Sequence, residues 1–366
     1  AGEKVPFDKY NYISKNCGYN YSKPNEKQLE TIDKLIKSIM PEDDKRDCLL
    51  SILKCCLIGK QTPHFAYFCG DGRNGKGLLL ENLSEAIGDY FTYSQKDFLL
   101  SPIKKGADTT LWDMRQKRMI VFSEPEEDEK LNASTVKAIT DNPVFSGRGL
   151  YMEQAEIFLT CMVVLECNKK PVIKGRVQMA LMERIITLMF SSSFTLDDDE
   201  VDEENRIFKA NPHYKSTEFK MEHRCAWIDY IIKKGKDNIY IPASVKNESR
   251  EFLMTNDDLL GWFLEKYEQS GNKENIPYIK IKDVYAEFQT SDYYMSLTGR
   301  EKNAKWNKKQ FQQNIMSNVL LKKFFKSKKT IGHTSVSSIL MGWQRKPEEA
   351  DDKPVSPEEH PSALDI

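Results

Sequence analysis

One glycine-rich segment carries the residues best suited to bind a phosphate group. It lies between the apolar run HFAYFC and the amphipathic stretch KGLLLENLSEAIGDY, and it reads Gly70, Asp71, Gly72, Arg73, Asn74, Gly75, Lys76 and Gly77. Glycines let the backbone turn tightly enough to aim several N–H groups at one anion, and the N-terminus of the next helix adds its positive dipole end. The Lys76 ammonium then reaches the terminal phosphates. The segment therefore predicts a P-loop that binds a nucleotide.

The last position of this segment departs from the usual P-loop pattern. A Ser or Thr there normally places a hydroxyl on Mg²⁺, whereas Gly77 has no side chain. Either water or a neighbouring side chain fills that coordination position, or the site binds nucleotide and hydrolyses it poorly.

Three further apolar runs have a polar residue at one end. Glu124 follows MIVF and is the carboxylate expected to hold magnesium through water and to polarise the attacking water, with Glu126 and Glu127 as alternatives. Asn168 ends FLTCMVVLECN, where an amide can orient water beside a γ-phosphate or simply form a turn. Arg184 precedes IITLMF. It is either a cation with a role in the site or a member of a surface salt bridge.

Positioning these residues requires a scaffold of alternating strands and helices. From His64 onward short apolar runs alternate with helical stretches, which predicts an α/β fold with a parallel or mostly parallel sheet. We expect an N-terminal helical domain at 1–60, the α/β core at 61–200, a helical linker region at 201–256, a basic winged-helix-like domain at 257–345 and a disordered acidic tail at 346–366.

Composition narrows the classes of protein further. The chain has 366 residues, 40% of them hydrophobic and 30% charged, with a net charge of -1, which favours two or three domains. No apolar run approaches the roughly 18 residues of a membrane span, so we expect no membrane partner. Eight cysteines without a CxxC pair indicate reduced thiols in an intracellular protein rather than disulfides or structural zinc.

Charge is distributed unevenly along the chain. Residues 197–204 read DDDEVDEE, which is typical of a solvated linker. Residues 300–329 contain ten basic residues and one acid, with aromatic residues interleaved. This block either binds DNA or is the solvated face of helices, and its candidate DNA contacts are Lys322, Lys323 and Lys326.

The order of these segments resembles the superfamily 3 helicases. The similarity runs through GDGRNGK, RMIVFSEPEE, LNASTVKAITDNPVFSGRGLY, a strand ending in Asn and an Arg before a further strand, over roughly residues 25–195. It looks closest to the poxvirus-type primase-helicases of large nucleocytoplasmic DNA viruses and their phage relatives.

The resemblance implies an AAA+-like core that assembles into a ring, usually a hexamer, around DNA, with ATP and Mg²⁺ bound between subunits. It makes Lys76 the phosphate-binding lysine, Glu124 the acid of the second motif and Asn168 the sensor. Arg184 falls where the family places an arginine finger. Relatives often show two adjacent arginines there, whereas this sequence has Glu183 and Arg184, so the assignment rests on one residue and Arg176 is its rival.

The resemblance also implies a DNA-gripping β-hairpin in the central channel. Residues 144–158 would supply it, with Arg148 and Tyr151 as the candidate contacts. We expect an ATP-dependent DNA helicase of viral genome replication, acting at host cytoplasmic replication sites, with the primase domain upstream and missing from this chain. The alternatives are a DNA translocase or loader that does not separate strands, and a ring scaffold that binds nucleotide without hydrolysing it.

Overall fold

The computed structural model describes residues 14–347, except for 104–108, 127–128, 142–143, 148–154, 170, 175–180, 182, 256–257, 272–275, 319 and 332–333. The chain divides into two compact units, unit 1 at Ala1–Asp257 and unit 2 at Asp258–Ile366. Each unit is described by itself.

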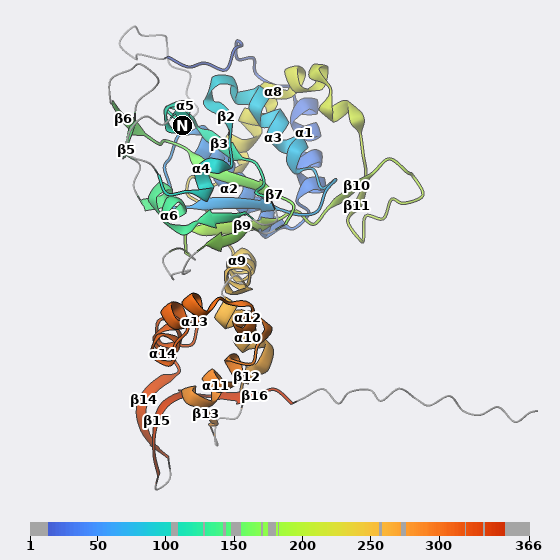
Figure 1. The fold of residues 1–366 in the computed structure, drawn as a ribbon. Helices are drawn as coiled ribbons and strands as arrows, with labels where there is room; N and C mark the ends of the chain where they lie inside the picture. The colour runs from blue at the N-terminus through green and yellow to red at the C-terminus, as the bar shows by residue number, and fades with distance from the viewer. Residues whose placement is uncertain are drawn as a thin grey trace, which may run out of the picture. The chain divides into compact units, whose positions relative to one another are not determined.

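A five-stranded parallel sheet organises unit 1 (Figure 1). Its strands lie in the order β2 (Phe91–Ser94), β3 (Met119–Phe122), β7 (Met162–Cys167), β1 (Phe65–Cys69) and β9 (Ile185–Met189). The three central strands are continuous apolar runs because parallel sheets are covered on both faces. The expected parallel α/β core is therefore confirmed.

Alternate residues of β1 enter different cores. Ala66 and Phe68 pack in a cluster with the helices α1 (Glu26–Ile39), α2 (Asp43–Leu57), α3 (Lys76–Ile87) and α8 (Thr217–Lys234). Phe65 and Tyr67 pack in a second cluster with α4 (Asp97–Leu100), α5 (Thr109–Asp113) and α6 (Ala133–Asp141). Since Phe68 is completely buried, its truncation to Ala would cost about 3–5 kcal/mol. These two cores hold the strand that leads into the glycine-rich loop.

Short elements complete unit 1. They are η2 (Gly88–Tyr90), β4 (Lys130–Asn132), β5 (Val144–Gly147), β6 (Ala155–Phe158), β8 (Val172–Lys174), β10 (Ser193–Thr195), β11 (Ile207–Lys209), η3 (Pro212–Lys215) and α9 (Ala243–Thr255). The pairs β4–β8 and β10–β11 are parallel, whereas β5–β6 is an antiparallel hairpin.

The helices at both ends of unit 1 share one hydrophobic core with residues of its sheet. Helix α1 begins with a capping box between Asn25 and Gln28 and ends just before Pro41, as expected for a sharp stop. Helix α8 contacts α1, α2 and α3 and buries Trp227 completely. The boundaries expected at residues 60 and 200 therefore lie inside unit 1.

Unit 2 combines helices with an antiparallel sheet. The three-stranded sheet has the order β13 (Tyr278–Lys280), β15 (Thr334–Met341) and β14 (Phe325–Ile331), and β12 (Tyr267–Gln269) pairs with β16 (Trp343–Arg345). Its helices are α10 (Asp258–Lys266), α11 (Ile281–Phe288), α12 (Asp292–Ser296), α13 (Gly299–Lys305) and α14 (Lys308–Ser317). Phe288 lies at the centre of an aromatic core with Trp262, Trp306 and Phe311. Within the described ranges, no helix is long and apolar enough to cross a membrane.

Candidate nucleotide-binding site

The carboxyl ends of three neighbouring strands bring the predicted residues together. Strand β1 leads into the glycine-rich loop, β3 into Glu124 and β7 into Asn168. Parallel strands all end at the same edge of a sheet, and loops at that edge form the usual ligand site of open α/β folds. The register pairs Cys69 with Cys167, so the loop and Asn168 begin side by side.

Two glycines of the loop are required by its geometry. Gly70 has φ +153°, and a Cβ there would lie 2.5 Å from the carbonyl oxygen of Phe190. Gly75 has φ +85°, and its Cβ would lie 2.7 Å from Cγ1 of Ile39. By contrast, a Cβ on Gly72 would meet no atom within 4 Å. The backbone therefore turns where only glycine fits, as a phosphate cradle demands.

The loop opens directly into helix α3, whose first N–H group, that of Lys76, donates to Oδ1 of Asn74 at 3.3 Å. Gly75 is the N-cap residue of α3 and contributes no side-chain hydrogen bond. The N-terminal N–H groups of a helix and its dipole favour an anion. Strand β10 anchors the preceding turn, because the Phe194 N–H donates to the Arg73 carbonyl at 2.8 Å. The loop is thus held beside an N-terminus suited to phosphate.

Lys76 is buried at the centre of the site, with 3% of its surface exposed. Its Nζ donates to the Gly70 carbonyl, to Oδ1 of Asn74 at 3.3 Å and to Oδ1 of Asn168 at 3.4 Å. Burial lowers the pKa of Lys76, and the nearby Glu166 carboxylate opposes that shift. The amine is therefore held between the loop and the end of β7 by uncharged oxygens that a phosphate can replace.

Glu124 and Asn168 form one hydrogen-bonded unit across β3 and β7. Oε1 of Glu124 accepts the backbone N–H groups of Asn168 at 2.7 Å and Lys169 at 2.8 Å. Its Oε2 accepts the Asn168 side-chain amide at 2.9 Å. These bonds fix the Asn168 amide so that its oxygen faces Lys76. Glu126, the alternative acid, instead pairs with Lys96 at 2.8 Å, and Glu127 lies outside the described residues.

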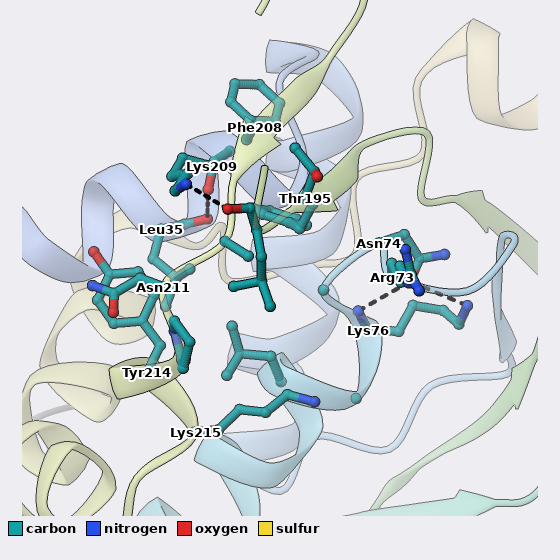
Figure 2. Close-up of a pocket in the computed structure, with 18 of the residues that line it drawn as sticks. Leu35, Arg73, Asn74, Lys76, Thr195, Phe208, Lys209, Asn211, Tyr214 and Lys215 are labelled. Atoms are coloured by element: carbon teal, nitrogen blue, oxygen red, sulfur yellow. Dashed lines mark hydrogen bonds between the residues drawn. The ribbon is translucent and has the colours of Figure 1, made fainter. Parts of the chain in front are cut away.

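A cavity of about 970 Å³ opens beside the loop (Figure 2). Loop residues Asn74 and Lys76 lie at one side, and Phe208 and Tyr214 lie across the cavity from them. Its lining includes loop residues 72–78, Lys34, Leu35 and Ser38 from α1, Glu166, Asn168 and parts of residues 194–215. The cavity thus has a cationic, N–H-rich side for phosphates and a more apolar side that suits a nucleobase.

The segment expected as a solvated acidic linker takes part in this cavity. Asp197 and Glu203 line it, and Glu200 accepts a hydrogen bond from the Thr195 hydroxyl at 2.6 Å. Most of the acidic side chains in this segment are exposed. The parallel pair β10–β11 brings this segment next to the glycine-rich loop, which composition alone does not indicate.

Glu166 also lines the cavity, although the sequence motifs do not indicate it. It lies on β7 opposite Phe68 of β1, lines the cavity and stands close enough to Lys76 and Glu124 for their charges to affect it. Burial raises the pKa of the Glu166 carboxyl, and Lys76 partly offsets this effect. The available signal was a carboxylate inside the otherwise apolar run MVVLEC.

Arg184 lies at the other edge of the sheet. It directly precedes β9, where its carbonyl accepts the Phe65 N–H at 2.8 Å, and its guanidinium pairs with Asp141 at the end of α6. The amino ends of β1 and β9 are opposite the edge that carries the glycine-rich loop, and Arg184 does not line the cavity. The structure therefore does not bring Arg184 to the nucleotide site of its own chain.

The remaining sequence candidates lie apart from the cavity or outside the described residues. The hairpin expected at 144–158 is present as β5 and β6, but Arg148 and Tyr151 lie outside the described residues, as does Arg176. In unit 2, Lys322, Lys323 and Lys326 are exposed, and Lys326 lies on β14. None of these three lysines takes part in an ion pair with another described residue.

The carboxyl ends of β3 and β7 carry carboxylate and amide oxygens, which are the kinds of ligand that Mg²⁺ takes. Among the described residues no group of three or more His, Cys, Asp and Glu side chains is arranged to hold a metal ion on its own. A magnesium ion carried by a nucleotide needs only one or two protein oxygens, because phosphates and water supply the rest. Glu166, Glu124 and Asn168 fit that smaller role.

Comparison with known proteins relates the chain to proteins of large DNA viruses. No family model matches it. It is 25% identical over 311 residues to L207/L206 of Acanthamoeba polyphaga mimivirus, provisionally named a helicase, covering 80% of this chain and 32% of that protein. It is 23% identical over 183 residues to Primase D5 of fowlpox virus, covering 49% of this chain and 23% of that protein. Frog virus 3 protein 022R, also provisionally named a helicase, is 29% identical over 165 residues, covering 43% of this chain and 17% of that protein.

Solved structures give weaker similarities. The apo C-terminal region of NrS-1 aligns with a TM-score of 0.47 and 13% identity, covering 89% of this chain and 78% of that one. The JCV helicase aligns with a TM-score of 0.33 and 12% identity, covering 63% and 60%. The chain spans about a third or less of the length of the curated relatives. These relatives confirm the resemblance seen in the motifs: the chain is a distant homologue of the helicases and primase of giant viruses and poxviruses.

Proposed function

We propose that this chain is an ATP-dependent DNA helicase of viral genome replication. One observation carries the proposal: Lys76, Glu124 and Asn168 converge at the carboxyl ends of adjacent strands, beside a glycine cradle and the N-terminus of α3. Phosphoryl transfer needs mainly positioning and charge stabilisation, and this arrangement provides both. The homology to viral helicases supports the same activity.

The chain's own residues have distinct roles in the proposed site. The loop N–H groups and Lys76 bind the phosphates, and Asn168, oriented by Glu124, positions a water molecule beside the terminal one. Glu124 accepts a proton from that water, or would help to hold Mg²⁺ through a water molecule. When bound, Mg²⁺ neutralises charge on the phosphate oxygens. The apolar side of the cavity, near Phe208 and Tyr214, receives the base.

Arg184 is proposed to act on the neighbouring subunit. The sheet separates it from the cavity of its own chain, so a catalytic role requires a second copy whose P-loop edge faces it. A cation inserted in this way stabilises charge on the transferred phosphoryl group and makes hydrolysis depend on assembly. This arrangement supports a ring, with a hexamer as the expected form.

Two regions are proposed to contact DNA. The β5–β6 hairpin would carry Arg148 and Tyr151 into a central channel, where a cation meets phosphate and an aromatic ring stacks on a base. In unit 2, α14 and the following β14–β15 hairpin have the order of a winged-helix module, with Lys322, Lys323 and Lys326 exposed between and along them. Exposed lysines attract the phosphate backbone without reading its sequence.

Gly77 favours one alternative function. If the missing hydroxyl has abolished hydrolysis, the chain is a ring scaffold that nucleotide only locks together. A translocase or loader that leaves DNA strands paired is the other alternative. We also propose that the intact protein works beside a primase domain, since one relative is named a primase, and that it acts at replication sites in the host cytoplasm.

Strand separation tests the proposed function. The wild-type chain should displace a labelled strand from a forked duplex only when ATP and Mg²⁺ are present, and Lys76→Ala should not. A translocase would instead displace a triplex-forming strand from duplex DNA while leaving the fork intact. A scaffold would form nucleotide-dependent oligomers without releasing phosphate, and that result would overturn the helicase assignment.

A further inference from the structure

Position 77 has room for a side chain that the sequence does not supply. A Cβ built on Gly77 would have Oε1 of Glu166 as its nearest neighbour, at 3.8 Å, which is an ordinary contact distance. Gly70 and Gly75 differ, because a Cβ at either would collide with the fold. Steric crowding therefore does not explain the glycine at 77, although a hydroxyl at this position normally faces the metal.

The nearest neighbour of position 77, Glu166, is a carboxylate in an environment that disfavours its charged form. Glu166 is the one charged residue of β7, and burial disfavours its ionised form. Within the described part of the chain it accepts no hydrogen bond and forms no ion pair, so its oxygens face the cavity without a fixed protein partner. A carboxylate kept in this position is ready to bind a cation.

Glu124 is less available for direct coordination. Its two oxygens already accept three N–H groups from Asn168 and Lys169, at 2.7–2.9 Å. Direct metal binding by Glu124 would disrupt the bonds that orient Asn168. Of the two carboxylates at these strand ends, Glu166 can therefore coordinate metal at lower cost.

We propose that the Glu166 carboxylate supplies the Mg²⁺-facing oxygen that residue 77 lacks. The inference rests on the proposed nucleotide-binding function. Adjacent oxygens on one octahedral Mg²⁺ lie about 3 Å apart, because each is about 2.1 Å from the ion. An oxygen 3.8 Å from the Cβ position of residue 77 can therefore reach the same ion as a hydroxyl on that carbon. Glu166 lies two residues before Asn168. In this proposal the end of β7 therefore binds the metal ion through Glu166 and positions the water molecule through Asn168.

The test uses four forms of the chain and measures binding rather than turnover. They are the wild type, Glu166→Gln, Gly77→Ser and the double variant. Affinity for a fluorescent ADP analogue is measured in excess Mg²⁺ and in EDTA, and Mn²⁺ binding with ADP is followed by electron paramagnetic resonance. Glu81→Gln is the matched control, because Glu81 lies on α3 near the site but pairs with Lys220 and does not line the cavity.

Mg²⁺ should tighten ADP binding to the wild type, and Glu166→Gln should reduce this enhancement, taken as the ratio of the affinities in Mg²⁺ and in EDTA, about tenfold. Gly77→Ser in the Glu166→Gln background should restore much of the enhancement, since it returns the usual hydroxyl. Glu81→Gln should behave like the wild type. An unchanged Mg²⁺ enhancement in Glu166→Gln, with the wild-type Mn²⁺ spectrum, would overturn the proposal. Failure of the wild type to bind ADP in both Mg²⁺ and EDTA would instead overturn the proposed nucleotide site itself.

Discussion

Unit 1 and unit 2 present their charged side chains in opposite ways. In unit 1, Lys76 is buried and Glu124 is fixed by three hydrogen bonds. In unit 2, Lys322, Lys323 and Lys326 are exposed. A buried polar network depends on every member, whereas exposed charges act together through a field that salt screens. Single changes should therefore abolish the function of unit 1 but only weaken that of unit 2.

The largest effect is expected at Lys76. Lys76→Ala removes the cation that faces the phosphates, so ATP hydrolysis should fall by about 1,000-fold or more. A phosphate-release assay measures this effect, and circular dichroism checks that the fold is kept. Lys246→Ala, which removes an exposed lysine of α9, should hydrolyse ATP normally. Equal ATP hydrolysis by Lys76→Ala and Lys246→Ala would contradict the expectation that single changes abolish the function of unit 1.

Arg184→Ala should lower hydrolysis by about 100-fold while leaving nucleotide affinity unchanged, because its target is the neighbouring subunit's phosphate. Mixing Arg184→Ala with Lys76→Ala subunits should restore part of the activity, since some interfaces then pair an intact loop with an intact arginine. Asp141→Asn removes the negative charge that pairs with Arg184 but keeps the Arg184 cation, so this variant should still hydrolyse ATP. Complete inactivity of the mixture would contradict action between subunits.

The loop glycines allow a sharper test within unit 1. Gly70→Ala forces a Cβ against the Phe190 carbonyl and should lower the free energy of unfolding by about 1–3 kcal/mol. Gly72→Ala meets no atom within 4 Å and is the matched control, with a change near zero. Urea denaturation of both variants measures the difference. Equal stabilities would mean that the loop does not hold the described conformation.

The smallest effect per residue is expected in unit 2. Replacing Lys322, Lys323 and Lys326 with Glu should weaken binding to single-stranded DNA and flatten its salt dependence, by about 0.7 in the logarithmic slope for each lost phosphate contact. Fluorescence anisotropy at several salt concentrations measures both quantities. The charge-matched control replaces Lys23, Lys27 and Lys246, which are exposed lysines of unit 1. If both triple variants lose affinity equally, the basic stretch has no special role.

Local patterns were sufficient for the strands and the loop, but contacts between distant segments were not. Continuous apolar runs predicted β1, β3 and β7, and the glycine spacing predicted the turn into α3, because each depends on neighbouring residues. The position of Glu166 close to Lys76 becomes apparent only when β7 lies beside β1. Likewise, the packing of Trp227 on α3 makes α8 part of unit 1, and a helix alone does not reveal its packing partner.

ATP hydrolysis by the purified chain, with Mg²⁺ and with or without single-stranded DNA, tests the central claim most directly. The account predicts turnover that rises when DNA is added and disappears in Lys76→Ala. Equal turnover with and without DNA, or turnover that survives Lys76→Ala, would contradict it.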